Sequence, residues 1–286
     1  MLDYESIKTL TYEFQKICSN YGVKYNASMI SNGYSFTDES IMELDNLSIS
    51  SVQITVDGTK QVHELRRPMI SGDESFERII KNMIAINHKT NAEVHLRINV
   101  DKDNIQSAYE LVCYLTEIGL TDVDVNLGMM KAFGGDHMCG NEAKNLFSMR
   151  EFADEFFRFK EHLINNGFYH AVEKMMPEYK VNSCTMDAPN SYVIDPDGYV
   201  YKCISKVGQR EYSIGNVRGE FNDKAHLTVD AFEVETCTKC KYFPICKGGC
   251  LMNNQREQKE CNIWKFITEE LLVSDIDFKL QENMLQ

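Results

Sequence analysis

The chain has 286 residues, of which 43% are hydrophobic and 26% are charged, so it can bury one large core or two smaller ones. Lys and Arg number 30 against 43 Asp and Glu, and the formal net charge of -13 disfavours binding to nucleic acid or to an anionic membrane surface. The opening residues MLDYESIKTL contain no apolar run, and no later stretch is long enough to span a membrane, so we expect a cytoplasmic protein.

The first part of the chain alternates helix and strand patterns. Apolar residues at helical spacing predict helices over residues 4–21, 76–84, 105–118 and 148–166. Short apolar runs or period-two alternation predict strands over residues 25–30, 52–56, 94–100 and 123–127. Strands that alternate with helices in this way predict an α/β fold with about four parallel strands. Four strands are few for a closed barrel, so either the sheet is open or a larger domain begins elsewhere.

Ligands of such sheets bind beyond the carboxyl ends of the strands. Three loops are expected there, namely residues 31–33, 57–58 and 131–137. Cys113 and Cys18 lie in helical patterns, and we expect them to be core residues. A final helix is predicted over residues 264–286.

The second part is dominated by cysteine: seven of the ten cysteines lie between Cys184 and Cys261. The spacing is Cys184-x13-Gly198-x4-Cys203, followed by Cys237-x2-Cys240-x5-Cys246-x3-Cys250 and then Cys261. In a chain without an export signal, this density predicts metal ligands rather than disulfides. Seven thiolates exceed one four-coordinate site, so two sites are implied, and one of them is short of a cysteine. Zinc is the alternative to iron–sulfur clusters.

This spacing resembles the seven-cysteine SPASM domain of radical S-adenosylmethionine (SAM) enzymes of the peptide and protein maturase type. The segments Ser31-Asn32-Gly33, Thr55-Val56-Asp57-Gly58 and residues 63–67 are similar to the barrel strands and loops of that family. The resemblance implies a partial (β/α)6 radical SAM barrel over residues 1–170, a SPASM-like domain with two auxiliary [4Fe-4S] clusters over 171–263, and a helical tail over 264–286.

The resemblance also implies the ligand sets. The first auxiliary cluster would be held by Cys184, Cys203 and Cys250, and its fourth ligand would be Cys139, the substrate or none. The second would be held by Cys237, Cys240, Cys246 and Cys261. By the same resemblance, Thr55 and Arg67 would contact the amino-acid end of SAM, for which a hydroxyl and a guanidinium are suited. The resemblance names no catalytic residue.

One family motif is missing. The CxxxCxxC loop, which would bind a third [4Fe-4S] cluster beside SAM, does not occur in these 286 residues. We therefore expect an oxidoreductase at family level that modifies a peptide or protein substrate, with SAM cleavage failing in this chain alone. The alternatives are a noncatalytic iron–sulfur module that binds peptide or relays electrons for a partner chain, and a zinc-stabilised interaction protein. An open sheet edge would favour a partner or self-association.

Overall fold

The computed structural model describes residues 4–131, 145–219, 234–250 and 261–285, together with Phe221 and Phe232. The chain divides into two compact units, one comprising Met1–Ser148 and Glu155–Met175, the other comprising Met149–Asp154 and Met176–Gln286. The domain bounds expected from the sequence, at residues 170 and 263, stay a prediction.

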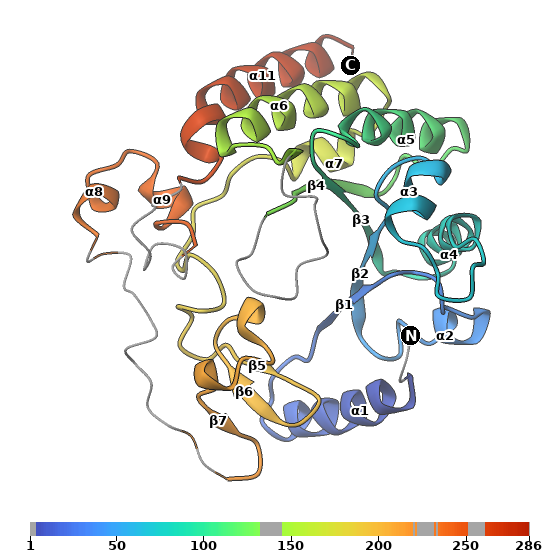
Figure 1. The fold of residues 1–286 in the computed structure, drawn as a ribbon, viewed down its shortest axis with the longest axis vertical. Helices are drawn as coiled ribbons and strands as arrows, with labels where there is room; N and C mark the ends of the chain where they lie inside the picture. Colours follow the sequence, from blue (N-terminus) through green and yellow to red (C-terminus); the bar gives the residue numbers. More distant parts are fainter. Residues whose placement is uncertain are drawn as a thin grey trace. The chain divides into compact units, whose positions relative to one another are not determined.

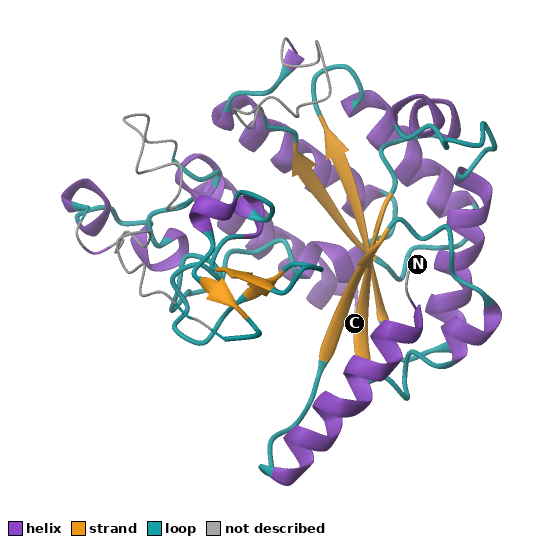
Figure 2. Ribbon diagram, turned by 60° about the horizontal axis from the view of Figure 1, so that its bottom comes forward, coloured by secondary structure: helices purple, strands orange, loops and turns teal. Residues whose placement is uncertain are grey.

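The first unit is built on a parallel sheet of four strands in the order β1-β2-β3-β4 (Figure 1). The strands are β1 (Ala27–Ser31), β2 (Ile49–Thr55), β3 (Glu93–Val100) and β4 (Asp124–Met129). All three pairings are parallel, and the strands cross as a strongly twisted fan (Figure 2). The predicted α/β class and the four parallel strands are confirmed.

Helices alternate with these strands along the chain. They are α1 (Tyr4–Asn20), α2 (Asp38–Met42), α3 (Lys60–Arg66), α4 (Phe76–Lys89), α5 (Ile105–Glu117), α6 (Met149–Asn165) and α7 (Tyr169–Glu173). The four long helices were predicted, and the short α2, α3 and α7 were not, because five to seven residues are too few to establish a helical period. Helices α3, α4 and α5 lie on the same side of the sheet (Figure 1).

The two faces of the sheet differ in chemistry. Val52, Ile54, Leu96 and Ile98 are fully buried, as the period-two pattern requires for strands packed under helices. The residues between them are polar and point to the other face: Gln53, Thr55, His95, Arg97 and Asn99. The unit therefore has an apolar layer between sheet and helices and a polar opposite face, on which ligands can be held.

The two cysteines expected in the core are not buried, since Cys18 on α1 is only partly covered and Cys113 is exposed. Cys113 is exposed on α5 and not in the core, because it lies on the side of the helix away from the buried Leu111, Val112 and Leu115. The apolar stripe of α1 forms the predicted helix but remains about half exposed, with Leu10 at 58%. Only Thr11 of α1 is buried.

The second unit contains little regular structure besides one long helix. A three-stranded antiparallel sheet is formed by β5 (Val193–Ile194), β6 (Tyr199–Tyr201) and β7 (Gly215–Asn216). Short helical turns follow: η2 (Ile204–Lys206), η3 (Arg210–Tyr212), α8 (Glu235–Thr238) and α9 (Phe243–Cys246). The chain then forms α11 (Trp264–Leu285), which confirms the predicted terminal helix. None of the described helices combines the length and the apolarity that crossing a membrane requires.

A β-hairpin, formed by β5 and β6, precedes Cys203. Asp195 accepts hydrogen bonds from the backbone N–H groups of Asp197 and Tyr199, at 3.0 and 2.8 Å, which closes the turn between β5 and β6. Gly198 has φ of +83° there, a conformation that glycine adopts without strain. Arg210 clamps the same turn, bonding Asp195 at 2.5 Å and Asp197 at 2.6 Å. Cys203 follows directly after this rigid hairpin.

Candidate functional site

The carboxyl end of the sheet in the first unit is organised by Asp57, which is 4% exposed. Its Oδ1 accepts the backbone N–H of Asn99 at 3.0 Å, and its Oδ2 accepts Arg67 Nε at 2.6 Å. Its carbonyl oxygen accepts Asn104 Nδ2 at 2.9 Å. One buried carboxylate therefore joins the loop after β2, the end of β3 and the residue that follows α3.

The two residues assigned to SAM from the sequence lie at this edge. Thr55 is the last residue of β2 and is buried, two positions before Asp57. Arg67 follows α3, and its side chain, 37% exposed, reaches Asp57. Arg67 bonds Asp57 through Nε alone. Its two terminal guanidinium nitrogens have no partner among the described residues. The SAM roles of the two residues stay a prediction.

The loop that contains Asp57 is held in place by His63, which is buried at 1% exposure. Its Nδ1 accepts the backbone N–H of Asp57 at 3.3 Å, and its Nε2 lies 3.2 Å from the hydroxyl of Ser75. Burial lowers the pKa of His63, so the neutral imidazole is the form that fits here. Glu64 accepts the backbone N–H groups of Ser75 and Phe76 at 2.7 and 2.6 Å, at the start of α4.

Sequence reasoning missed a second arginine at this edge. Arg97 Nε donates to Asn99 Oδ1 at 2.9 Å, and a Cβ placed on Gly128 would lie 2.3 Å from Arg97 Nη2. Burial lowers the pKa of Arg97, partly offset by the charge of Asp57. The available signal was the alternation of β3, in which His95, Arg97 and Asn99 interrupt the apolar residues at every second position.

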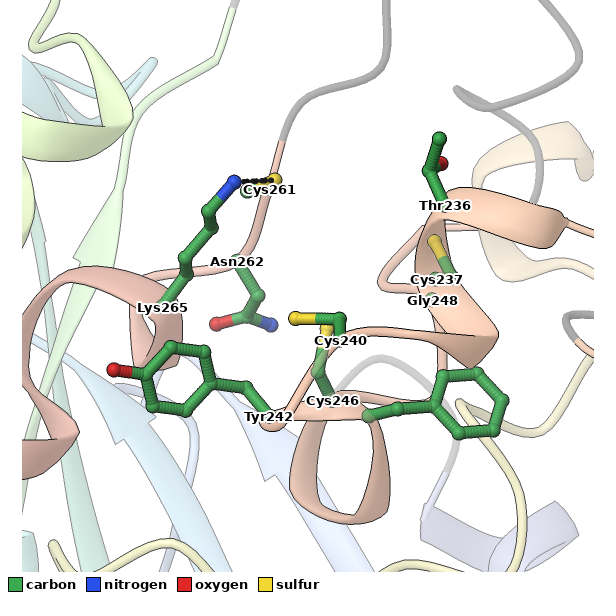
Figure 3. A pocket seen from close by; sticks show the side chains of 10 residues that line it. Thr236, Cys237, Cys240, Tyr242, Cys246, Gly248, Cys261, Asn262 and Lys265 are labelled. Carbon is green, nitrogen blue, oxygen red and sulfur yellow. Dashed lines mark hydrogen bonds between the residues drawn. The ribbon is translucent and has the colours of Figure 1, made fainter.

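In the second unit, the four cysteines assigned to the second auxiliary cluster line one cavity of about 270 Å³ (Figure 3). Cys237 lies in α8, Cys240 follows it, and Cys246 ends α9. The chain then turns sharply at Lys247 and Gly248, both with positive φ, and Cys261 enters from the segment before α11. Residues 24 positions apart, Cys237 and Cys261, thus reach the same cavity.

Hydrogen bonds already surround two of these thiols. Burial raises the pKa of the Cys246 thiol, while the backbone N–H groups of Gly248 and Asn262 at the sulfur oppose that shift. Lys265 Nζ donates to Cys261 Sγ at 3.4 Å, drawn as a dashed line in Figure 3. N–H groups directed at sulfur stabilise metal-bound thiolates and tune the potentials of iron–sulfur clusters.

The other three cysteines are not brought together to the same extent. Cys184 Sγ accepts the backbone N–H of Met186 at 3.4 Å, and Cys203 packs against the small core of Met186 and Phe243. Cys250 is exposed. Cys139 lies outside the described residues. The assignment of these residues to a first cluster stays a prediction.

The donor set of this cavity is four thiols, from Cys237, Cys240, Cys246 and Cys261. Four thiolates are the complete ligand set of a [4Fe-4S] cluster, and zinc accepts the same four donors. The side chains therefore fit either group, and metal and sulfide analysis distinguishes the two.

Comparison with known proteins shows distant relatives. No family model matches the chain. It is 22% identical over 271 residues to the cysteine-type anaerobic sulfatase-maturating enzyme of Clostridium perfringens strain 13, covering 87% of this chain and 70% of that protein. The enzyme of strain ATCC 13124 is 23% identical over 269 residues, with the same coverage.

Solved structures show the same fold. Native anSMEcpe with bound AdoMet and Cp18Cys peptide has a TM-score of 0.70 and 18% identity, and covers 96% of this chain and 82% of its own. Polyhistidine-tagged anSMEcpe with bound AdoMet has a TM-score of 0.67 and 16% identity, with 96% and 78% covered. Streptococcus suis SuiB bound to S-adenosylmethionine reaches 0.51 at 12% identity, with 87% and 60% covered. The resemblance of this chain to the radical SAM maturases, which its cysteine spacing predicted, is thus confirmed.

Proposed function

We propose that this chain forms the SAM-facing sheet edge and the auxiliary-cluster domain of a radical SAM oxidoreductase that modifies a peptide or protein substrate, acting in the cytoplasm. The observation that carries the proposal is the cavity shared by Cys237, Cys240, Cys246 and Cys261. The resemblance to the SPASM domain assigned the same four residues to one cluster. The similarity to sulfatase-maturating enzymes over 87% of the chain supports the same function.

The chain's own residues would bind and orient the cofactors. Lys265 and the backbone N–H groups at Cys246 would stabilise thiolates at the second cluster. Arg67, fixed by Asp57, would present its terminal nitrogens to the carboxylate of SAM beside the hydroxyl of Thr55. The bound cofactors would supply one-electron transfer and hydrogen-atom abstraction. The protein would bind the cofactors and orient them toward the substrate.

A second candidate is a noncatalytic iron–sulfur module, favoured by the lack of CxxxCxxC in these residues. Its cluster domain would bind peptide or relay electrons for a chain that carries the motif. In either case, SAM cleavage requires the three-thiolate loop from outside these 286 residues. Reductant and SAM would yield 5'-deoxyadenosine only after that loop is supplied.

The first sheet edge offers a place for such a partner or for a second copy. Among the described strands, β1 pairs only with β2, and Ile30 on β1 is 72% exposed. We expect light scattering to show association that Ile30→Lys weakens, because an added charge opposes strand pairing. A monomer with the wild-type residue would argue against this edge as an interface.

The metal content tests the cluster proposal directly. After anaerobic reconstitution, two [4Fe-4S] clusters predict about eight irons and eight sulfides per chain and no zinc. Cys240→Ala should lose about four irons, whereas Cys113→Ala, an exposed thiol outside the array, should lose none. About two zinc ions without sulfide would refute the iron–sulfur proposal and establish the zinc-stabilised alternative.

A further inference from the structure

A second group of ligand-type side chains lies at the amino end of the same sheet, at the opposite end of the strands from Asp57. Glu93 is the first residue of β3 and Asp124 the first of β4. His95 pairs in register with Asp124, and Glu93 lies two residues earlier on the same face. His170 comes from α7, which packs against β4. Three elements thus contribute two imidazoles and two carboxylates.

The distances match those around a metal ion. His95 Nδ1 lies 2.9 Å from Asp124 Oδ2, and His95 Nε2 lies 3.6 Å from Glu93 Oε2. Ligand atoms of Glu93, His95 and Asp124 all fall within 4.8 Å of one another, and His170 Nε2 lies 3.5 Å from Asp124 Oδ1. Ligands at about 2.1 Å from a tetrahedral ion are about 3.4 Å apart, so these side chains need only small rotations to converge.

An independent observation points to a missing ligand. The Asp124 side chain is 9% exposed, and its Oδ1 has no hydrogen-bond partner in the described structure. A buried carboxylate oxygen without a partner is costly, and such atoms are usually satisfied by a donor or a cation. A cavity of about 230 Å³ adjoins it, lined in part by Glu93, Asp122, Asp124 and His170. The cavity therefore has room for an ion and carries the chemistry to hold it.

The position of Lys174 indicates that the missing ligand carries a positive charge. Its Nζ lies 2.7 Å from Glu93 Oε2 and 2.9 Å from Asp124 Oδ2, so an ammonium already neutralises part of the cluster. The Lys174 side chain is 39% exposed, and its flexible stem can carry the ammonium out into solvent. A metal cation that binds the two carboxylates would take over this neutralisation.

We propose that Glu93, His95, Asp124 and His170 form a binding site for a divalent transition-metal cation, which exchanges with the ammonium of Lys174. Two imidazoles favour zinc or iron over calcium or magnesium, whose sites consist of oxygen ligands, and the two carboxylates also suit manganese. The ion would tie α7 to the ends of β3 and β4. The proposal does not depend on the cysteine array or on SAM.

Manganese binding to the full chain tests the proposal, with Mn²⁺ as the probe because carboxylates suit it and thiolates do not. The cysteines are first filled by cluster reconstitution, and free Mn²⁺ is followed by its electron paramagnetic resonance signal. We expect one Mn²⁺ per chain. Lys174→Met should tighten binding by about tenfold, since it removes the competing cation. The His95→Gln/His170→Gln double variant should weaken it by at least about tenfold.

Asp122→Asn is the matched control, because Asp122 lines the same cavity but lies outside the donor set. We expect its affinity for Mn²⁺ to stay within about twofold of wild type. The Lys174→Met variant keeps the test decisive even if a ligand variant fails to fold. Its predicted effect is tighter Mn²⁺ binding, which an unfolded protein could not show. The proposal is overturned if Lys174→Met binds no stoichiometric Mn²⁺, or if the double histidine variant binds as tightly as wild type.

Discussion

Replacing Asp57 tests whether one carboxylate holds the carboxyl edge of the sheet together. Asp57→Ala leaves the part-buried backbone N–H of Asn99 without its acceptor, which costs about 1–3 kcal/mol. The substitution also leaves Arg67 without its carboxylate partner. That side chain is 37% exposed and can be hydrated, so losing the ion pair costs about 1 kcal/mol of unfolding free energy rather than the full cost of breaking a buried pair. We expect a total loss of about 2–4 kcal/mol in the free energy of unfolding.

Two further variants separate these contributions. Asp57→Asn keeps an acceptor for Asn99 and loses only the charge, so it should cost about 1 kcal/mol. Asp45 accepts a backbone N–H of Asn91 in the same way, but on the exposed surface, and Asp45→Ala should stay within about 0.5 kcal/mol of wild type. Denaturant unfolding measures the free energies, and hydrogen exchange at the Asn99 amide reports the local bond. If Asp57→Ala matches Asp45→Ala, Asp57 does not organise this edge.

Three other changes have defined outcomes. Lys265→Met removes the donor to Cys261 Sγ, so the reduction potential of the reconstituted second cluster should fall, and an unchanged potential in redox titration would contradict the role of this bond. Gly128→Ala should displace Arg97, whose Nη2 would lie 2.3 Å from the new Cβ, and weaken SAM binding measured calorimetrically without loss of iron; equal affinity would exclude Arg97 from that site. Burial lowers the pKa of His63 in the folded state, so protons bind the unfolded chain preferentially. The stability from His63 should therefore be complete above about pH 6.5 and fall by about 1.4 kcal/mol per unit below it, and His63→Gln should lack this slope in denaturant unfolding.

The strands were predictable because their signal is local. In β3, Val94, Leu96, Ile98 and Val100 alternate strictly, and this alternation is what a strand with one face under helices requires. The grouping of Cys237, Cys240, Cys246 and Cys261 came instead from the resemblance to the SPASM domain. These four residues line one cavity, and their role as ligands stays a prediction.

Features that depend on distant contacts were not predictable. Cys113 lies in an apolar helical run, but its exposure depends on which side of α5 meets the sheet. The clash that excludes a side chain at Gly128 involves Arg97, 31 residues earlier on the neighbouring strand. His170 and Asp124 meet only because α7 returns to the start of β4. No periodicity or residue spacing in the sequence predicts these long-range contacts.

The two sites in the first unit share the polar face of the sheet but remain independent. His95 and Asn99 lie four residues apart on β3, which corresponds to about 13 Å along a strand. An ion at His95 and Asp124 would lie between β3 and β4, whereas Thr55 lies on β2, on the other side of β3 and about 7 Å further along the sheet, so the two ligands share no residue. Metal binding at the amino end should stabilise the attachment of α7 while leaving SAM affinity unchanged, so each proposal can fail while the other stands.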